Sequence, residues 1–253
     1  MTLKANDRRL LIAEHIAGAG EVTVDALSGL FDVSPETIRR DLTRLDASGD
    51  LRKVHGGARP VRLHTENSFY ERMSEDAQAK HSIAKKLFSE VHEGDTLFVD
   101  TGSTTLIACA ALCKIPGLTV ITNSVQNAQV MADACNQHRV FLLGGVFSSE
   151  ASQTTGALVL EQIDRFQADH AVLTCVGMDI AAGVTNANCH EAEVARAMIK
   201  RSENIIFLCP TSKIGRRAAH RVCEINDVGA VLTERPVNTE FHDALFSAGV
   251  RLP

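Results

Sequence analysis

Three arginines and several hydroxyl side chains stand together between residues 34 and 45, which read Ser-Pro-Glu-Thr-Ile-Arg-Arg-Asp-Leu-Thr-Arg-Leu. A guanidinium group can bind a guanine edge through two hydrogen bonds or hold a backbone phosphate. These residue types therefore favour contacts with duplex DNA, and the candidates are Ser34, Glu36, Thr37, Arg39, Arg40 and Arg44. A surface helix with solvated charges would carry similar residues, so the flanking sequence has to decide.

The same stretch predicts the helix that would present these side chains. Ser34 is a good N-cap, and Pro35 suits the first helical position, where its missing N–H costs nothing. Ile38, Leu42 and Leu45 recur at the spacing of one buried helical face. The arginines lie off this face and are expected to be exposed.

Two further helices are expected before it, over 6–17 and 24–31, the first ended by Gly18 and Gly20. A tight turn at 32–33 then gives a helix-turn-helix. The inward-facing residues predicted for these two helices are Leu10, Leu11, Ala13, Ile16, Ala17, Leu27, Leu30 and Phe31.

Residues 51–58, Leu-Arg-Lys-Val-His-Gly-Gly-Ala, predict a β-ribbon, or wing, beside the arginine helix. Arg52, Lys53 and His55 would point outward, and Gly56-Gly57 permits a sharp reversal with positive φ. These three side chains join the candidates for DNA contact.

The charge distribution supports a local DNA-binding patch. The formal net charge of −5 at pH 7 argues against a generally basic nucleic-acid binder. Acidic residues dominate 1–37, but the order reverses over 39–62, where a phosphate backbone would be met. The basic residues there are Arg39, Arg40, Arg44, Arg52, Lys53, Arg59 and Arg62.

The composition, with 45% hydrophobic and 23% charged residues, is that of a globular protein. No apolar run reaches the roughly 18 residues of a membrane span, and 1–11 lacks the apolar segment of a signal peptide. The seven cysteines contain no Cys-x-x-Cys pair, which predicts a reducing compartment, the cytoplasm, without disulfides or zinc. Cys109, Cys175 and Cys209 are expected to be small buried hydrophobes. No metal or cofactor is expected.

From residue 94 onward, short apolar runs alternate with helical patterns, which indicates a Rossmann-like α/β domain with a largely parallel sheet. Strands are predicted over 96–100, 118–122, 139–143, 170–176, 204–209 and 230–233, and helices near 77–91, 104–112, 125–134, 157–165, 191–201 and 240–248. We therefore expect a winged helix-turn-helix domain over 1–58, a linker over 59–76 and an α/β domain over 77–253. Ligands bind such sheets beyond the carboxyl ends of the strands.

The first strand of this domain ends in Asp100-Thr101-Gly102-Ser103-Thr104-Thr105 and runs into a helix. Gly102 allows close approach of a ligand, and the free N–H groups at the helix start, with the hydroxyls of Ser103, Thr104 and Thr105, suit a phosphate. An ordinary N-capped helix after a turn is the alternative. The loop has neither the lysine of a P-loop nor the Gly-x-Gly-x-x-Gly pattern, which disfavours ATP and NAD.

Other strand ends carry further candidates for the ligand site, which are Thr122, Asn123, Gly144, Gly145, Gly177 and Lys213. Backbone crowding is the alternative explanation for Gly144-Gly145. The ammonium of Lys213 would complement a phosphate dianion or a sugar carboxylate. Glu191 lies in the first turn of a helix and favours the helix dipole whether or not it contacts a ligand.

The two N-terminal motifs, at this spacing, resemble the signature of the DeoR family of bacterial transcription regulators. The order of the later motifs resembles the family's effector domain, so the resemblance covers essentially the whole chain; they are Asp-x-Gly-Ser-Thr-Thr (100–105), Ile-Thr-Asn-Ser (121–124), Leu-Gly-Gly (143–145), Gly-Val-Thr (183–185), Glu-Ala-Glu-Val (191–194) and Ser-Lys (212–213). It implies a repressor of a carbohydrate-utilisation operon, homodimeric or homotetrameric, that binds double-stranded operator DNA. It also implies an effector that is a phosphorylated sugar, polyol or sugar acid.

The family's effector domain is similar to ribose-5-phosphate isomerase, and it binds phosphorylated sugars without turning them over. The resemblance implies that the effector pocket is lined by Asp100, Gly102, Ser103, Thr104, Thr105, Asn123, Gly145 and Lys213. Two positions depart from the family pattern: Pro210 replaces the usual Asp, and Cys175 stands where small residues are commoner. Both weaken the alternative, an isomerase-like enzyme fused to a DNA-binding head with Asp100 or Glu191 as its base.

Overall fold

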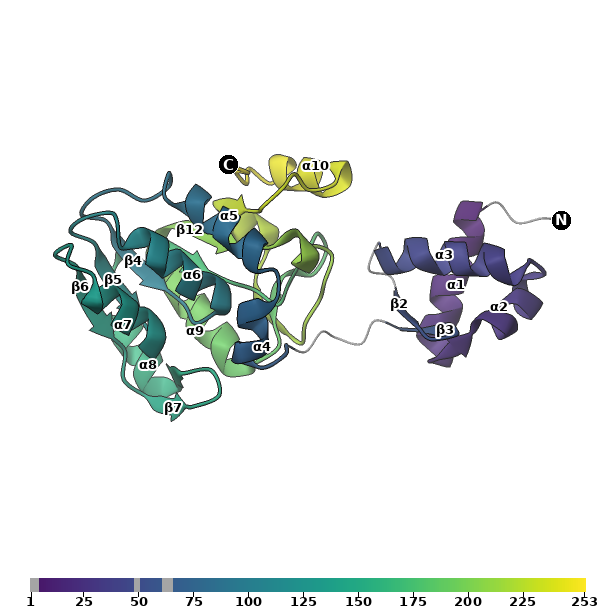
Figure 1. Cartoon of the computed structure of the whole chain (residues 1–253), viewed down its shortest axis with the longest axis horizontal. Coiled ribbons are helices and arrows are strands. Elements are labelled where there is room, and N and C mark those ends of the chain that lie inside the picture. Colours follow the sequence, from purple (N-terminus) through teal and green to yellow (C-terminus); the bar gives the residue numbers. More distant parts are fainter. Residues whose placement is uncertain (1–4, 48–50, 61–65) are drawn as a thin grey trace. The chain divides into compact units, whose positions relative to one another are not determined.

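A computed structural model describes residues 5–47, 51–60 and 66–253. The chain divides into two compact units, Met1–Leu63 and His64–Pro253, which we call the head and the body (Figure 1). Each unit has its own buried hydrophobic core. Among the described residues, no helix has the length and apolar character needed to cross a membrane.

The head packs three helices against a small antiparallel sheet of order β1-β3-β2. The turn at 32–34 joins α2 to α3, with Asp32 in the left-handed conformation (φ 49°), so the expected helix-turn-helix is present. The head's elements are α1 (Ala5–Ala19), β1 (Val22–Thr23), α2 (Val24–Phe31), α3 (Pro35–Ala47), β2 (Leu51–Val54) and β3 (Gly57–Pro60).

The end predicted for α1 is wrong. The helix continues through Gly18 to Ala19, and the backbone turns only at Gly20, whose φ is 83°. The amide of Gly20 still bonds the carbonyl of Ile16 at 3.0 Å, which completes the last turn. Gly18 is therefore tolerated inside the helix, and Gly20 alone supplies the left-handed residue that ends it.

The inward faces of α1 and α2 also differ from prediction at three leucines. Leu10, Leu11 and Leu30 are exposed. Ile16 is fully buried, as predicted, and the buried face of α1 also carries Ile12, which was not predicted and is fully buried. This face is fixed by packing against α3, a tertiary contact that apolar periodicity alone does not specify.

β2 and β3 form the predicted wing. Their register pairs Leu51 with Pro60 and Val54 with Gly57, which leaves a two-residue turn in which Gly56 has a φ of 76°. Gly57 serves a different purpose, because a Cβ there would clash with the carbonyl oxygen of Val22 in β1. Positive φ thus explains one glycine of the pair, and close strand approach explains the other.

Six parallel strands form the central sheet of the body, in the order β14-β12-β9-β4-β5-β6. They correspond to the six predicted strands. The chain proceeds from β4 through β5 to β6 on one side and from β9 through β12 to β14 on the other, so the topological switch point lies between β4 and β9. The strands are β4 (Thr96–Val99), β5 (Thr119–Thr122), β6 (Arg139–Leu142), β9 (Ala168–Leu173), β12 (Ser202–Leu208) and β14 (Ala230–Leu232).

Helices cover both faces of this sheet because successive strand residues alternate between two cores. Leu97 and Val99 pack in a cluster with residues of α5, α6 and α7, whereas Phe98 packs in a cluster with residues of α8, α9 and α10. These helices are α5 (Ala77–Leu87), α6 (Ser103–Leu112), α7 (Val125–Asp133), α8 (Ala157–Ile163), α9 (Cys189–Lys200) and α10 (Thr239–Ser247).

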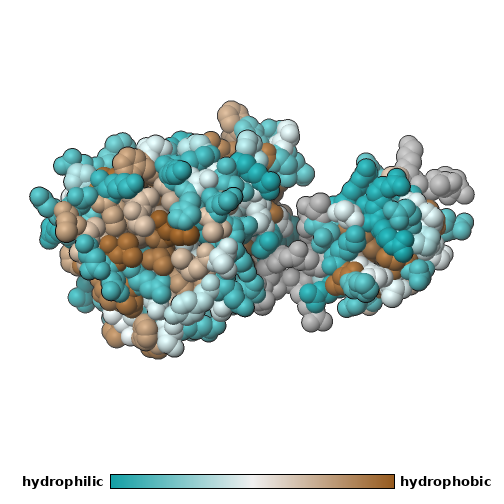
Figure 2. All heavy atoms as spheres, in the orientation of Figure 1, coloured by the Kyte–Doolittle hydropathy of each residue, from teal (hydrophilic) through white to brown (hydrophobic). Residues whose placement is uncertain are grey.

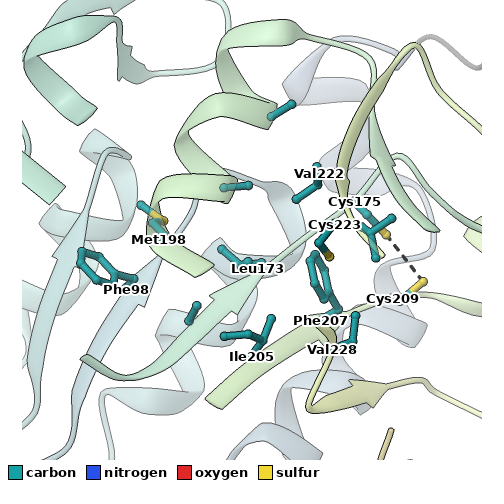
Figure 3. Close-up of a cluster of buried hydrophobic side chains, with 14 of the residues drawn as sticks. Phe98, Leu173, Cys175, Met198, Ile205, Phe207, Cys209, Val222, Cys223 and Val228 are labelled. Atoms are coloured by element: carbon teal, nitrogen blue, oxygen red, sulfur yellow. Dashed lines mark hydrogen bonds between the residues drawn. The ribbon is translucent and has the colours of Figure 1, made fainter. Parts of the chain in front are cut away.

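Buried cysteines belong to these cores, as predicted. Cys109, Cys175 and Cys209 are at most 2% exposed, and all are free thiols. Figure 3 shows Cys175 and Cys209 beside Phe207, with their sulfur atoms 3.8 Å apart. Among the described residues, no group of three His, Cys, Asp or Glu side chains is arranged to hold a metal ion.

Several short elements escaped the sequence analysis. They are α4 (Phe69–Ser74), the hairpin of β7 (Val146–Ser148) and β8 (Gln153–Thr155), the small sheet of β10 (Gly177–Asp179), β11 (Gly183–Asn186) and β13 (His220–Cys223), and the 3₁₀ turns η1 (Thr211–Lys213) and η2 (Ile225–Asp227). α4 falls in the segment interpreted as linker. Ser68 and Glu71 form a capping box at its start, a Ser-x-x-Glu signal that the sequence did contain.

Candidate functional site

One face of α3 is buried and the other is exposed, as its periodicity predicts. Ile38 and Leu42 are fully buried and Leu45 is 6% exposed. Hydrophilic side chains cover the visible surface of α3 in Figure 2. Of the predicted DNA-contacting residues, the exposed ones are Ser34, Glu36, Arg39, Arg40, Arg44, Lys53 and His55, and Thr37 is half-buried. The side chain of Arg52 lies outside the described part of the chain.

Local hydrogen bonds orient this exposed face. Ser34 Oγ accepts the backbone N–H of Thr37 at 3.3 Å, which is the predicted N-cap. The wing is tied to the same helix by Lys53, whose ammonium donates to Thr43 Oγ1 at 3.0 Å and whose backbone N–H donates to Asp46 at 3.1 Å. The helix and the wing therefore present one continuous surface.

An acidic residue of α3 is turned inward and neutralised. Asp41 is 3% exposed, and one of its oxygens lies 2.7 Å from Nε of Arg8 in α1. Arg9 lies 3.9 Å from the other oxygen. Because Asp41 is paired inside the head, it does not offset the positive charge that the outer face of α3 presents to a polyanion.

In the body, Asp100 spans the topological switch point. It follows β4, and its Oδ2 accepts the backbone N–H of Thr174, which follows β9, at 2.8 Å. Its Oδ1 is buried and has no hydrogen-bond partner among the described residues. Burial raises the pKa of Asp100 well above its ordinary value of 3.8, and the neighbouring Glu191 adds to this shift. A buried carboxyl group with an open oxygen at this edge could contact a ligand.

The start of α6 fits the predicted anion nest. Its N-cap residue, Gly102, makes no side-chain capping bond, so within the described part of the chain the first N–H groups of the helix are not capped by a side chain. Ser103, Thr104 and Thr105 are each at most 4% exposed. Gly102 is also needed for space, since a Cβ there would lie 2.7 Å from Thr174 Oγ1.

The hydroxyl of Thr105 has an internal role. It donates to the carbonyl oxygens of Asp100 and Gly102, each at 3.0 Å, and so holds the loop in shape. Asn127 of α7 supports the same loop by donating to the Asp100 carbonyl at 2.8 Å. The nest is therefore preorganised by its neighbours rather than by a ligand.

A second polar network starts at the end of β5. Asn123 accepts a hydrogen bond from Thr101 at 3.2 Å and donates to Gln153 at 3.3 Å. Gln153 in turn donates to Glu191 of α9 at 2.7 Å. Burial raises the pKa of Glu191, against the effect of the Gln153 hydrogen bond. Asn123 and Glu191, two of the predicted ligand residues, are thus linked through Gln153, which the sequence did not single out.

Four other predicted residues have packing or backbone roles in this structure. A Cβ on Gly145 would lie 2.6 Å from the carbonyl oxygen of Thr155, and a Cβ on Gly177 would clash with the backbone of Arg216. Gly144 is bonded through both its N–H and its carbonyl by the side chain of Gln162. Thr122 Oγ1 accepts the N–H of Ser124 at 3.0 Å.

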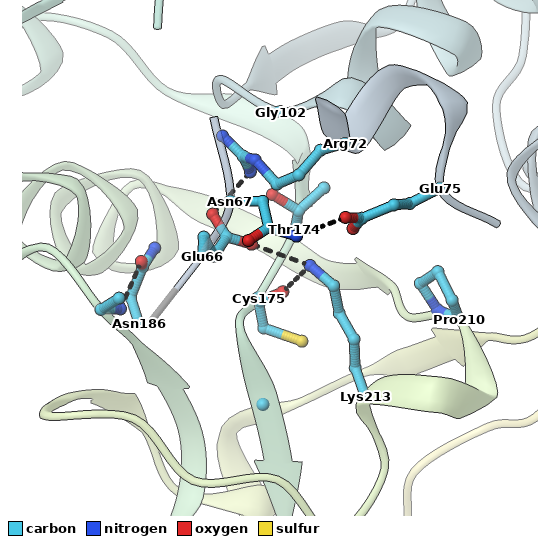
Figure 4. A network of polar contacts seen from close by, with 12 residues as sticks. Glu66, Asn67, Arg72, Glu75, Gly102, Thr174, Cys175, Asn186, Pro210 and Lys213 are labelled. Carbon is cyan, nitrogen blue, oxygen red and sulfur yellow. Dashed lines mark hydrogen bonds and ion pairs between the residues drawn. The ribbon is translucent and has the colours of Figure 1, made fainter. Parts of the chain in front are cut away.

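Lys213 lies in a cluster of charges that Figure 4 shows close to Gly102 and Thr174. Its ammonium donates to the carbonyl oxygen of Cys175 and lies 3.1 Å from Oε1 of Glu66. Oε2 of Glu66 lies 2.5 Å from Nη1 of Arg72 in α4. Neither Glu66 nor Arg72 was a sequence candidate, because both lie in the segment interpreted as linker.

A cavity of about 280 Å³ opens beside these charges. Its lining is rich in carboxylate, amide and guanidinium groups and includes Glu66, Asn67, Arg72, Gln153, Asn188 and Glu191. This lining offers many hydrogen-bonding groups, and its apolar surface comes from Phe69, Ala151 and Ala187. It therefore suits a small polar ligand better than an apolar one.

Comparison with known proteins finds a family match for the head and another for the body. The DeoR-like helix-turn-helix domain matches residues 8–62, and the DeoR C terminal sensor domain matches residues 75–235. The chain is 30% identical to the HTH-type transcriptional repressor GlcR of Bacillus subtilis (strain 168), over 97% of this chain and 95% of the relative. It is also 30% identical to the glycerol-3-phosphate regulon repressor of Escherichia coli (strain K12), over 92% of each chain.

A solved ribose 5-phosphate isomerase A from Methanocaldococcus jannaschii is similar at 13% identity and a TM-score of 0.41, over 55% of each chain, which is too weak to carry an argument. The two domain matches together span most of the chain, and the two repressors match nearly its full length. This protein therefore belongs to the DeoR family of transcriptional regulators, with a DNA-binding helix-turn-helix head and a C-terminal sensor domain.

Proposed function

We propose that this regulator represses a carbohydrate-utilisation operon and that an anionic metabolite, a phosphorylated sugar or a related polyol or sugar acid, controls its affinity for operator DNA. The observation that carries the DNA-binding part is the exposed arginine face of α3 opposite fully buried Ile38 and Leu42. Two relatives support the regulated pathway: the transcriptional repressor GlcR of Bacillus subtilis and the glycerol-3-phosphate regulon repressor of Escherichia coli.

The proposed DNA contacts follow from the exposed surface of the head. α3 would enter the major groove with Arg39 and Arg40 toward base edges, while the wing would lie along the backbone. Phosphate contacts by the remaining cations would position the head without reading sequence. The proposed set is Ser34, Glu36, Thr37, Arg39, Arg40, Arg44, Arg52, Lys53 and His55.

The proposed effector site is the sheet edge at the switch point. The uncapped start of α6, the open oxygen of Asp100 and the ammonium of Lys213 support recognition of an anion that also carries hydroxyl groups. An effector changes DNA binding only through its difference in affinity between the DNA-competent and DNA-incompetent states. The proposed ligand-side residues remain Asp100, Gly102, Ser103, Thr104, Thr105, Thr122, Asn123, Gly144, Gly145, Gly177, Glu191 and Lys213.

We further propose that two or four copies assemble in the cytoplasm, so that paired heads occupy two operator half-sites. The edge strand β6 and the adjoining β7 and α8 support association between copies. Their exposed apolar side chains are Phe141, Leu142, Val146, Phe147 and Leu158. Light scattering on the full chain would test this, and a monomer at micromolar concentration would contradict it.

An isomerase-like activity is the second candidate, because Asp100 and Glu191 both have raised pKa values and lie close enough to influence one another. We propose that they bind a ligand and do not catalyse, since Asp100 is buried and its Oδ2 is already bonded by Thr174. A turnover assay on ribose 5-phosphate and related phosphosugars decides this. Turnover abolished by Asp100→Asn would overturn the regulator-only proposal.

The main test is footprinting of the full chain on its own promoter region at moderate ionic strength, with and without a panel of phosphorylated sugars, polyols and sugar acids. We expect a protected sequence whose occupancy changes with one class of metabolite. A thermal-shift screen with the same panel identifies that class, because a ligand that binds only the native state raises the melting temperature. No protected sequence under any condition would remove the basis of the proposal.

A further inference from the structure

The carboxylate of Glu66 is held between two cations from distant parts of the body. One oxygen lies 2.5 Å from Nη1 of Arg72, and the other lies 3.1 Å from Nζ of Lys213. All three side chains are between 15% and 17% exposed. Each oxygen thus has its own cation in a partly desolvated place, which is how a bound anion is held (Figure 4).

Two further observations indicate that the surroundings of Arg72 and Lys213 can bind an anion. Nε of Arg72 is buried and has no hydrogen-bond partner among the described residues, so a donor is left for a further acceptor. Lys80 lies behind Arg72 and donates to its carbonyl oxygen. Burial, and then the charge of Lys213, lower the pKa of Lys80 to about 8, while Asp76 opposes this shift. Lys80 is therefore a third basic side chain close to Arg72 and Lys213, with Asp76 and Glu75 as acidic neighbours.

Arg72 and Lys213 lie at the sheet edge where the effector site is proposed. Lys213 also bonds the carbonyl oxygen of Cys175, the residue that follows Thr174 at the switch point. On its other side, Glu66 lines the 280 Å³ cavity, together with the side-chain amides of Gln153 and Asn188. A phosphate at the two cations would place an attached chain of hydroxyl groups in this cavity.

We propose that Arg72 and Lys213 form the phosphate subsite of the effector site and that the carboxylate of Glu66 occupies it when no effector is bound. A phosphate monoester dianion carries more charge and more acceptor oxygens than a carboxylate, so it displaces Glu66 and also satisfies Arg72 Nε. Glu66 stands in the chain between β3 of the head and α4 of the body. This inference rests on the proposed function.

The test is isothermal titration of the full-length protein with inorganic phosphate at constant ionic strength. Glu66→Gln removes the competing charge but keeps the side-chain shape, and we expect it to lower the dissociation constant about tenfold, because the subsite is then unoccupied. Lys213→Met is expected to abolish saturable binding. Glu90→Gln is the matched control, since Glu90 is a similarly shielded partner of Arg251 at 2.8 Å, and it is expected to bind phosphate like wild type.

Equal phosphate affinity in Glu66→Gln and wild type, or no saturable binding in either, would overturn the inference. Should Glu66→Gln melt far below wild type, Glu66→Asp replaces it, and its shorter reach is expected to tighten phosphate binding by a smaller factor. Operator binding by the same preparations is measured in parallel by gel shift. If the wild-type protein does not bind the operator, the proposed function is wrong. The phosphate titrations test only the proposed subsite.

Discussion

Thr174 donates two hydrogen bonds to Oδ2 of Asp100, from its backbone N–H at 2.8 Å and from its hydroxyl at 3.3 Å. These residues follow β9 and β4, the strands on either side of the switch point. The pair fixes the spacing of the two strand ends on which the nest and Lys213 depend. It also leaves a carboxyl group inside the protein, and that has a cost that depends on pH.

Stability should fall with rising pH because of Asp100. Burial raises its pKa well above 3.8, so the native state keeps a proton that the unfolded chain has released. The stabilisation is present below about pH 3.8 and is lost as the pH rises through the native-state pKa. Asp100→Asn should therefore gain free energy of unfolding relative to wild type as the pH rises above 3.8, measured by urea denaturation.

Asp133→Asn provides the control, since Asp133 is an exposed carboxylate of α7 in the same unit. Its difference from wild type should stay nearly constant over the same pH range. A difference between Asp100→Asn and wild type that does not change with pH would show that Asp100 is not held in its protonated form.

Space, and not backbone conformation, should make glycine necessary at position 102. The φ of Gly102 is −177°, which any residue adopts, but a Cβ would lie 2.7 Å from Thr174 Oγ1 and 3.1 Å from its Cγ2. Gly102→Ala should therefore lose about 1–3 kcal/mol of unfolding free energy through overpacking. Removing both obstructing atoms in Gly102→Ala/Thr174→Ala should recover part of this loss.

Thermal melts of wild type, both single variants and the double variant measure this coupling. Thr174→Ala by itself removes the hydroxyl bond to Asp100 and should be mildly destabilising. If the two single losses simply add in the double variant, the steric explanation for Gly102 is wrong.

Removing one partner of the buried ion pair of Arg8 and Asp41 should lower the free energy of unfolding more than replacing both partners with apolar residues. The two side chains are 9% and 5% exposed and join α1 to α3 at 2.7 Å. Arg8→Met removes the closer of the two arginines that pair with Asp41 among the described residues and should cost the head about 3 kcal/mol, because a buried charge loses this partner. Arg8→Met/Asp41→Leu should cost less, since neither charge is then buried. Denaturation curves of the full chain that show the double variant to be the less stable would contradict this.

Local patterns in the sequence were enough to predict the helix-turn-helix, the wing and all six strands of the main sheet. Those elements depend on apolar spacing and turn residues that lie close together in the chain. The cluster of Glu66, Arg72 and Lys213 could not be predicted in this way, because folding alone brings these residues together. The role of Gly102 likewise depends on Thr174 of a different strand. α4 and η2 were missed despite a local signal, the capping boxes of Ser68 and Glu71 and of Glu224 and Asp227.

Arg39 and Arg40 should carry much of the operator affinity. Both are exposed on α3 opposite its buried face, so truncation removes possible base contacts without disturbing the core. Arg39→Ala and Arg40→Ala should each weaken operator binding by about 1–3 kcal/mol if the side chain reads a base, measured by gel shift. The loss for Arg39→Ala should not arise from unfolding, since its ion pair with Glu36, at 3.4 Å, is an exposed one.

Salt dependence separates base reading from phosphate contact in the same experiment. A residue that binds phosphate should reduce the slope of log affinity against log salt by about one when truncated, whereas a base-reading residue should leave the slope nearly unchanged and relax sequence preference. Arg165→Ala, at an exposed position of the body, serves as the control and should alter neither quantity. Operator binding that is unchanged in both Arg39→Ala and Arg40→Ala would count against α3 as the recognition helix, because no other described helix of the head carries three exposed arginines on one face.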